Sequence, residues 1–194
     1  MSRIAEPEKM NHIRKATMEA LIDHGYGGMS IESISKKAGV SAGYLYRHYK
    51  SKEELVQVLV DSEMDEIIDS FISDIDSSGS LYEAGYKTIH KLFMKANQEP
   101  LLAKFSAAVV MDIKIPSKDK ADNFKSILEL ADKCIQLGLK TGEINSQISA
   151  LEVLVVSFTI PFRYLSISLE INSSKKFTPE EVKRVAVMCL NALK

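Results

Sequence analysis

The residues best suited to chemistry lie in one short stretch, Tyr44–Tyr49. This stretch places three phenols, a guanidinium and an imidazole within six consecutive positions. If it is helical, Tyr44, Arg47 and His48 share one face, because residues three and four apart lie on the same side of an α-helix. Leu45 and Tyr49 are four apart and can face inward. The small pair before them, Ala42 and Gly43, lets the helix N-terminus approach a surface closely, and a phosphate binds well at such a terminus.

The flanking residues predict that this stretch is the second helix of a helix-turn-helix. Ser30 is placed to cap a first helix over 31–38, because its hydroxyl can accept from the free N–H groups of the first turn. Gly39 ends that helix, since glycine enters the left-handed region at no steric cost. Ser41 caps a second helix over 42–49. Two short helices joined by a glycine-containing turn are typical of a DNA-binding helix-turn-helix.

The helix that follows this pair begins directly afterwards, at the capping box formed by Ser51 and Glu54. Lys52 lies in its first turn, where the helix dipole disfavours a cation unless an anion is near. A DNA phosphate would be that anion, so we predict that Lys52 contacts the DNA backbone.

At this point the chain resembles a known family, the tetracycline-repressor-like (TetR/AcrR) transcriptional regulators. The motif covers about the first third of the chain, and beyond it the chain is similar only in length and helical character. The departures are Tyr44, where a small residue is commoner, Tyr49, where phenylalanine is usual, and Ser35, where alanine is frequent. The residues that carry the resemblance are Gly39, Val40, Ser41, Gly43, Leu45, Tyr46, His48, Tyr49, Lys52, Glu53, Glu54 and Leu55.

The resemblance implies that the second helix of the pair enters the major groove and that the lysine after it holds the DNA backbone. Transferred position by position, it implies these DNA-contact residues: Ser30, Ser41, Ala42, Gly43, Tyr44, Tyr46, Arg47, His48 and Lys52.

The distribution of charge is consistent with a DNA-binding N-terminal part. The net charge of the 194-residue chain is −1. Residues 1–52 nevertheless carry nine Lys/Arg against five Asp/Glu, a net +4, whereas residues 53–194 carry 16 against 21, a net −5. A basic end on an acidic body suits a protein that binds phosphates with one module. Random scatter of charge is the plainer alternative.

The periodicity predicts an all-α fold of about nine helices, and no stretch alternates as a strand would. We expect a first helix from Pro7 to His24, a fourth from Ser51 to Ile75 and further helices to the end of the chain. Pro161 should kink or break the apolar helix 148–171. We place a helix-turn-helix DNA-binding domain at 7–67, with the motif itself at about 30–49, and a C-terminal body for effector binding and dimerisation at 68–194.

The last two helices predict self-association, because an exposed apolar helix face usually marks an interface. Doubling two such helices about a two-fold axis makes a four-helix bundle. The resemblance implies a homodimer joined in this way, which would bind a palindromic operator. The alternative is that the helices complete a monomer core. The expected interface residues are Leu151, Leu154, Phe158, Val182, Val185, Cys189 and Leu193.

The middle helices are rich in aromatic residues, and in the family these helices surround an effector pocket. We therefore predict a mostly apolar pocket for a small apolar or amphipathic effector. Plain core packing is the alternative for each residue. The candidate pocket residues are Tyr86, His90, Phe93, Phe105, Met111, Phe124, Phe158 and Phe162, with Arg163 as a further polar candidate.

Other functions are disfavoured. No nucleophile elbow, P-loop, dinucleotide fingerprint or HExxH motif is present, so we expect no enzyme and no cofactor. The four histidines and two cysteines lack metal-ligand spacing, so we expect no metal site. The missing apolar signal core, the short apolar runs and the unpaired cysteines predict a cytoplasmic protein with no membrane span. The remaining alternative is a helical architectural or protein-controlled DNA-binding regulator without a small-molecule effector.

Overall fold

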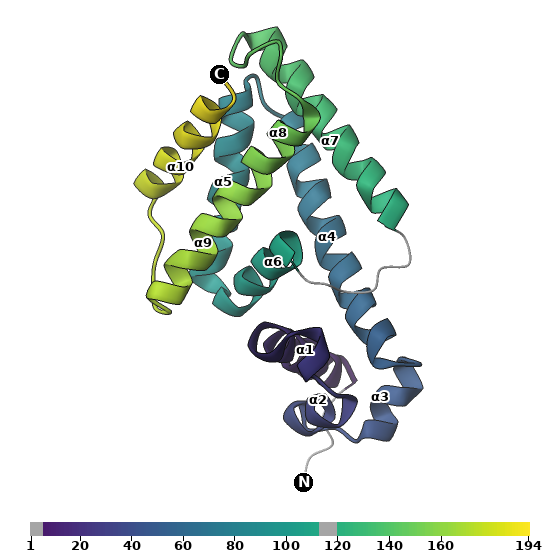
Figure 1. Ribbon diagram of the computed structural model, residues 1–194. Helices are drawn as coiled ribbons and strands as arrows, with labels where there is room; N and C mark the ends of the chain where they lie inside the picture. Colours follow the sequence, from purple (N-terminus) through teal and green to yellow (C-terminus); the bar gives the residue numbers. More distant parts are fainter. Residues whose placement is uncertain (1–5, 113–119) are drawn as a thin grey trace.

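The computed structural model describes residues 6–112 and 120–194, with backbone only at 112 and 120–124, and every regular element in this part is helical (Figure 1). The prediction of an all-α fold is therefore confirmed. The helices divide into a small N-terminal unit and a larger C-terminal body, and α4 runs from one into the other. The bounds are α1 Glu6–Gly28, α2 Ile31–Ala38, α3 Ala42–His48, α4 Lys52–Asp76, α5 Leu81–Gln98, α6 Pro100–Asp112, α7 Lys120–Thr141, α8 Ala150–Leu154, η1 Val155–Thr159, α9 Ile160–Ile171 and α10 Pro179–Ala192.

The helix-turn-helix forms through local capping, as the sequence predicts. Ser30 accepts a hydrogen bond from the backbone N–H of Ser33 at 3.1 Å and completes a capping box. Gly39 ends α2 in the left-handed conformation, with φ 71°. Ser41 accepts from the N–H of Tyr44 at 3.1 Å and starts α3. Because these contacts span only three or four residues, the sequence alone is enough to specify the turn.

Gly25 interrupts the first helix, close to where the sequence predicts its end. Its φ of 64° and ψ of 175° are non-helical, and the chain resumes helical geometry up to Gly28. A positive φ of this kind is accessible to glycine without strain. The kink turns the chain so that α2 can pack across α1.

Two hydrophobic cores meet along α4. The N-terminal core joins α1–α3 to the start of α4 and centres on Ile13, Ile34 and Leu45, each at most 1% exposed. The C-terminal core joins the rest of α4 to α5–α10. Membership of the cores changes between Leu59 and Ile67 of α4, so this helix is buried in both. Helix α6 also contributes to both, because Phe105 belongs to the N-terminal core and Ala107 to the C-terminal core.

The long apolar helix of the body contains a π-helical turn, η1, just before Pro161. Proline has no N–H to donate, and its ring displaces the carbonyl one turn earlier. A π turn absorbs that mismatch, since its hydrogen bonds reach one residue further. The expected kink at Pro161 thus takes the form of a π turn within a continuous helical run.

Within the described residues, one helical run, Ala150–Ile171, is long and apolar enough to cross a membrane by composition, and 33% of its most apolar window is buried. A core helix of a soluble protein passes the same test, so this run is weak evidence for a membrane span. Its buried residues, among them Val153, Leu165 and Leu169, pack inside the body.

Candidate DNA-binding surface and effector cavities

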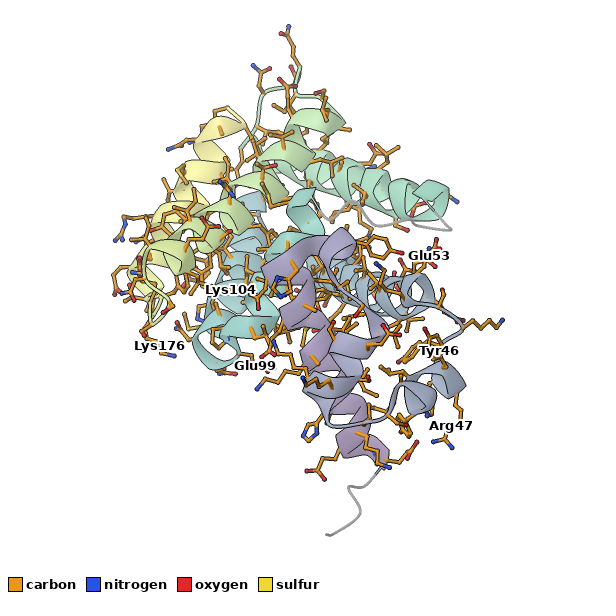
Figure 2. All side chains as sticks on the ribbon, turned by 60° about the horizontal axis from the view of Figure 1, so that its bottom comes forward. Tyr46, Arg47, Glu53, Glu99, Lys104 and Lys176 are labelled. Carbon is orange, nitrogen blue, oxygen red and sulfur yellow. The ribbon has the colours of Figure 1, made fainter. Side chains whose placement is uncertain are left out.

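The outer surface of α3 presents polar and aromatic side chains to solvent. Tyr46 is 53% exposed, and Arg47 is exposed beside it (Figure 2). His48 is exposed as well. Gly43 is exposed, and a Cβ placed there would meet no atom within 4 Å. Hydrogen-bonding side chains can contact base edges in the DNA major groove, and a backbone without a side chain at Gly43 allows the helix to approach closely. The expectation that Arg47 and His48 face outward is therefore confirmed.

Tyr44 lies on the same side of α3 as Arg47 and His48, as helical spacing predicts, but it is covered and not exposed. Its contact with DNA stays a prediction. Tyr44 is only 7% exposed, and its hydroxyl donates a hydrogen bond to the carboxylate of Glu6 in α1. The side chains of His48, Lys9 and Arg47 cover its ring, with the His48 ring 4.7 Å away and the two cations 5.0 and 5.2 Å away. Helical spacing placed Tyr44 near Arg47 correctly, but only the packing of α1 shows that it is covered.

The contact between Glu6 and Tyr44 perturbs both groups. The hydrogen bond from Tyr44 lowers the pKa of Glu6, and the same bond raises the pKa of Tyr44. The neutral phenol and the charged carboxylate are thus the stable pair near neutral pH. Tyr44 helps to hold α3 against α1 and so positions Arg47.

Lys52 makes contacts within the chain that the sequence did not predict, and its contact with DNA stays a prediction. Its ammonium group donates to the carbonyl oxygen of Tyr26 at 2.9 Å and to that of Met29 at 3.1 Å. It also lies 4.3 Å from the centre of the Tyr26 ring. These two carbonyl oxygens provide the partial negative charge near Lys52 that we expected from a DNA phosphate. An ammonium group has three N–H donors, so one donor remains beyond these two bonds.

The remaining candidates take capping or close-approach positions. Ser30 and Ser41 are exposed N-caps, and Ala42 is half-buried in the first turn of α3. The predicted DNA-contact residues do not include two exposed cations, Lys36 in the last turn of α2 and Lys50 directly after α3. Their position in the chain next to the two helices of the motif was the available signal.

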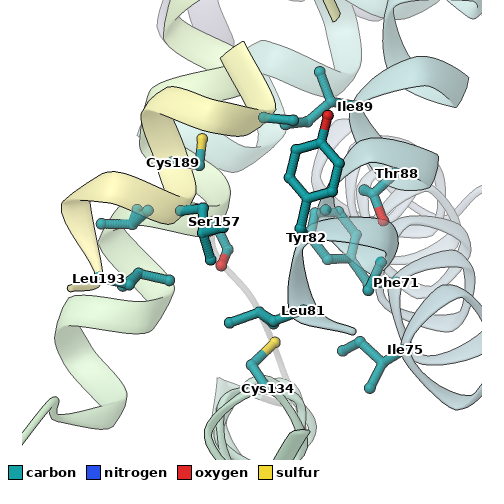
Figure 3. A pocket seen from close by; sticks show the side chains of 15 residues that line it. Phe71, Ile75, Leu81, Tyr82, Thr88, Ile89, Cys134, Ser157, Cys189 and Leu193 are labelled. Carbon is teal, nitrogen blue, oxygen red and sulfur yellow. The ribbon is translucent and has the colours of Figure 1, made fainter. Parts of the chain in front are cut away.

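An apolar cavity of about 50 Å³ lies inside the body, between α4, α5, α7, η1 and α10 (Figure 3). Its polar groups are the Tyr82 hydroxyl, Ser157 and Thr88, and Thr88 already donates to Asp74 at 3.0 Å. A second cavity of about 190 Å³ shares Phe71 and Thr88 with it as a wall. Phe71 stacks on Phe158, with ring centres 4.9 Å apart.

The predicted pocket residues do not converge on one cavity. Phe162 lines the second cavity, and Met111 and Arg163 line a separate cleft between α1 and the body. Tyr86 and His90 stack on each other with ring centres 6.0 Å apart, and neither lines the cavity of Figure 3.

Three more of these residues have other places. Phe93 is fully buried in the C-terminal core, between Tyr164 and Phe177. Phe105 is fully buried but belongs to the N-terminal core, so its assignment to a body pocket is corrected. The side chain of Phe124 lies outside the described residues. Aromatic spacing predicted burial correctly, but it did not distinguish a cavity wall from a filled core.

The predicted dimer residues divide in a similar way. Leu151 is 70% exposed and Leu154 is half-buried, as an interface requires. Phe158 and four residues of the C-terminal segment are buried against the chain's own core, so their assignment to an interface is corrected: Val182, Val185, Cys189 and Leu193. Periodicity identified an apolar face on the last helix, and the fold turns that face inward. The exposed apolar residues of α8–α10 are Leu151, Val155, Ile167, Ile171, Val187 and Met188.

A buried carboxylate joins the two parts of the molecule. Glu63 of α4 is 1% exposed and accepts a hydrogen bond from the hydroxyl of Ser106 in α6. Arg14 of α1 lies 3.7 Å from it and Lys95 of α5 lies 3.6 Å from it. Within the described residues, its Oε2 has no hydrogen-bond partner. No sequence pattern separates this glutamate from its exposed neighbours.

Comparisons with known proteins agree with this architecture. Residues 13–59 match the family model described as bacterial regulatory proteins of the tetR family. The chain is 26% identical over 138 residues to the fatty acid metabolism regulator protein of Bacillus subtilis (strain 168), covering 71% of each chain.

Solved structures show the same fold. A TetR family transcription regulator from Marinobacter aquaeolei VT8 superimposes with a TM-score of 0.75 at 21% identity, over 97% of this chain and 96% of that chain. The transcriptional regulator FadR from Bacillus subtilis, solved in complex with stearoyl-CoA, superimposes with a TM-score of 0.69 at 21% identity, over 95% of this chain and 97% of that chain.

Proposed function

The chain belongs to the tetR family of bacterial regulatory proteins, and we propose that it is a repressor that binds a palindromic operator as a homodimer and is released by a fatty acyl effector. It is a DNA-binding transcriptional regulator and not an enzyme. The observation that carries the proposal is the outward face of α3, where Tyr46 and Arg47 project from a rigid capped unit. We infer 7–67 as the DNA-binding domain and 68–194 as the body, and the change of core along α4 supports this division.

Base contacts are assigned to Arg47, Tyr46 and His48. Arginine pairs well with guanine in the major groove, and the bare backbone at Gly43 allows α3 to approach the bases closely. Ser30, Ser41 and Ala42 lie at the starts of α2 and α3, where they can face phosphates. One helix of this length contacts few bases, so two copies with half-sites about 34–36 Å apart are needed for a specific site.

The homodimer is assigned to the outward face of α8, α9 and α10. Ile171 is 82% exposed and Leu151 is 70% exposed, and further exposed apolar side chains lie between them on the same helical run and on α10. Exposed apolar surface of this kind marks an interaction site. Pairing with a second copy would bury this surface. The same pairing covers the long apolar helical run, which supports a cytoplasmic protein over a membrane-bound one.

The effector is assigned to the body cavities. The relatives named for fatty acid metabolism and the stearoyl-CoA complex support a long acyl chain as the ligand class. The cavity of Figure 3 is small, so such a chain would have to part Phe71 from Phe158 and join the two cavities. A ligand that needs this opened body favours one conformation over another, which is the thermodynamic condition for regulation.

The test begins with selection of an operator from random duplexes by the purified protein. We expect an inverted repeat, bound with steep salt dependence, and loss of binding on addition of stearoyl-CoA. Thermal-shift measurements with the same ligand should show a raised melting temperature, because the ligand binds the native state. Operator binding that no acyl compound relieves would instead favour an architectural or protein-controlled regulator.

A further inference from the structure

A large cleft lies between the two parts of the molecule and not inside the body. It has a volume of about 570 Å³ and lies where the end of α1 meets α6 and α9. One wall comes from Leu21, Ile22 and Tyr26 of α1, and the opposite wall from Ala107, Ala108 and Met111 of α6. These two walls are apolar, and polar side chains complete the lining, namely Lys104, Arg163, Ser166 and Glu170.

Two cations line this cleft. Lys104 of α6 and Arg163 of α9 are both lining residues, and Figure 2 shows Lys104 at the side of α6 that meets α1. Among the side chains of residues 6–111 and 125–194, no carboxylate lies within ion-pairing distance of either, whereas Lys87, Lys91 and Lys95 of the neighbouring α5 are all paired. Within this part of the chain, the donors of Lys104 and Arg163 are therefore available.

One acid lines the cleft, and it is already engaged. Glu170 accepts a hydrogen bond from Ser166 at 2.9 Å, so two cations face one carboxylate in the lining. The second body cavity is different, because Lys91 and Lys95 there lie against Asp74, Glu66 and Glu63. The excess of positive charge is thus a property of the cleft at the junction.

We propose that this cleft binds an anionic amphiphile, with its carboxylate or phosphate on Lys104 and Arg163 and its apolar part between α1 and α6. A guanidinium and an ammonium form strong charge-assisted hydrogen bonds with such oxyanions. The apolar walls bury the chain of the ligand. The site is separate from the body cavities and does not require that the acyl effector bind there.

An occupant of the cleft would touch both parts of the molecule. Leu21 and Tyr26 belong to the DNA-binding unit, and Ala108 and Arg163 belong to the body. Its affinity therefore depends on the angle between α1 and α6, and a ligand with such a dependence shifts that angle. The cleft is in this way a second point of control over the spacing of two α3 helices in a dimer.

The chain has no tryptophan, which allows a direct binding assay on the full-length protein. Tyr26→Trp places one fluorophore in the cleft wall and keeps an aromatic ring beside Lys52. The probes are decanoate, decyl phosphate and the neutral decanol, so that the carboxylate and phosphate arms are measured apart. We expect saturable fluorescence change with at least one anionic probe and binding that weakens with salt.

The charge variants are made in the same Tyr26→Trp background. Lys104→Gln with Arg163→Gln should weaken the anionic probe at least about tenfold, since two charge-assisted bonds are lost, and should leave decanol unchanged. Lys140→Gln, which removes an exposed charge from α7, is the matched control and should bind as the parent does. Lys104→Arg, with Arg163 retained, keeps both positive charges and should bind the anionic probe nearly as tightly as the parent.

Two results overturn the proposal. One is the absence of a saturable signal with both anionic probes in a folded Tyr26→Trp protein. The other is equal affinity in the parent and the double variant. Neither result would contradict the proposed operator binding or its relief by stearoyl-CoA, because those are measured separately with DNA.

Discussion

The ammonium group of Lys52 donates a 2.9 Å hydrogen bond to the carbonyl oxygen of Tyr26 and lies 4.3 Å from the ring of the same residue. It thereby joins the start of α4 to the link between α1 and α2. The helix-turn-helix packs between these elements, so Lys52 stabilises the geometry on which α3 depends.

Replacing Lys52 with alanine should therefore affect folding as well as DNA binding. Two hydrogen bonds from a charged group are lost, and we expect about 1–2 kcal/mol lower stability by urea unfolding, because the side chain is partly solvated. If its remaining donor also meets a phosphate, binding to all DNA sequences should weaken and the salt slope should fall by about one unit. Unchanged stability would contradict the structural role.

Arg47→Ala and Tyr46→Ala should change sequence preference more than general DNA affinity. Both side chains are exposed on α3, and a good base contact is worth about 1–3 kcal/mol of discrimination. Fluorescence anisotropy on the selected operator and on random duplex measures the two affinities. Lys140→Ala on α7 serves as the control. Equal losses on both duplexes would remove the residue from the set that contacts bases.

Removing both cations beside Glu63 should destabilise the protein. Arg14→Leu with Lys95→Leu leaves a buried carboxylate with Ser106 as its partner. We expect a loss of roughly 2–4 kcal/mol, near the lower end of the range for a broken buried pair, because Arg14 is still 44% exposed. Adding Glu63→Met should recover most of it. A double variant as stable as the wild type in urea would refute the pairing.

Charge on the outward face of α8 and α9 should separate the homodimer. Leu151 and Ile171 are 70% and 82% exposed in the single chain. Replacing both with glutamate places two carboxylates on the proposed apolar interface. Light scattering after size exclusion should give the monomer mass, with circular dichroism unchanged. Leu139→Glu on α7, where the leucine is 45% exposed, should remain dimeric. A dimer that survives the double change would move the interface elsewhere.

The two thiols should be unreactive in the folded protein. Burial raises the pKa of Cys134 to about 12 and that of Cys189 to about 12. Near pH 8 both stay protonated when folded, so labelling by a thiol-specific reagent should be slow and should become fast in concentrated urea. The stability that comes from the neutral thiols is full below the ordinary thiol pKa near 9.0 and is lost as the pH rises toward 12.

An effector in the cavity of Figure 3 should slow thiol labelling further, since both cysteines line that cavity. The comparison is made on the native protein over long labelling times, with and without stearoyl-CoA. In denaturant, a ligand bound anywhere on the native state would slow labelling by stabilising the fold. Equal rates at saturating ligand would place the acyl chain outside this cavity.

The sequence by itself determined the elements that depend on short-range interactions. The caps at Ser30 and Ser41 and the left-handed turn at Gly39 each involve residues three to five apart, so the helix-turn-helix could be predicted nearly to the residue. Apolar periodicity likewise identified the helices of the body, because it records which positions avoid water.

Only the tertiary structure decided what each helix face meets. Tyr44 is covered because α1 brings Glu6 and Lys9 over it, and Val182 and Val185 point inward because α5 and α9 supply a core for α10. Glu63 becomes a buried junction through partners on three other helices, one of them Ser106, which is 43 residues along the chain. An amphipathic pattern specifies that a face must be buried, but the choice between the chain's own core, a second copy and a ligand depends on packing between distant segments.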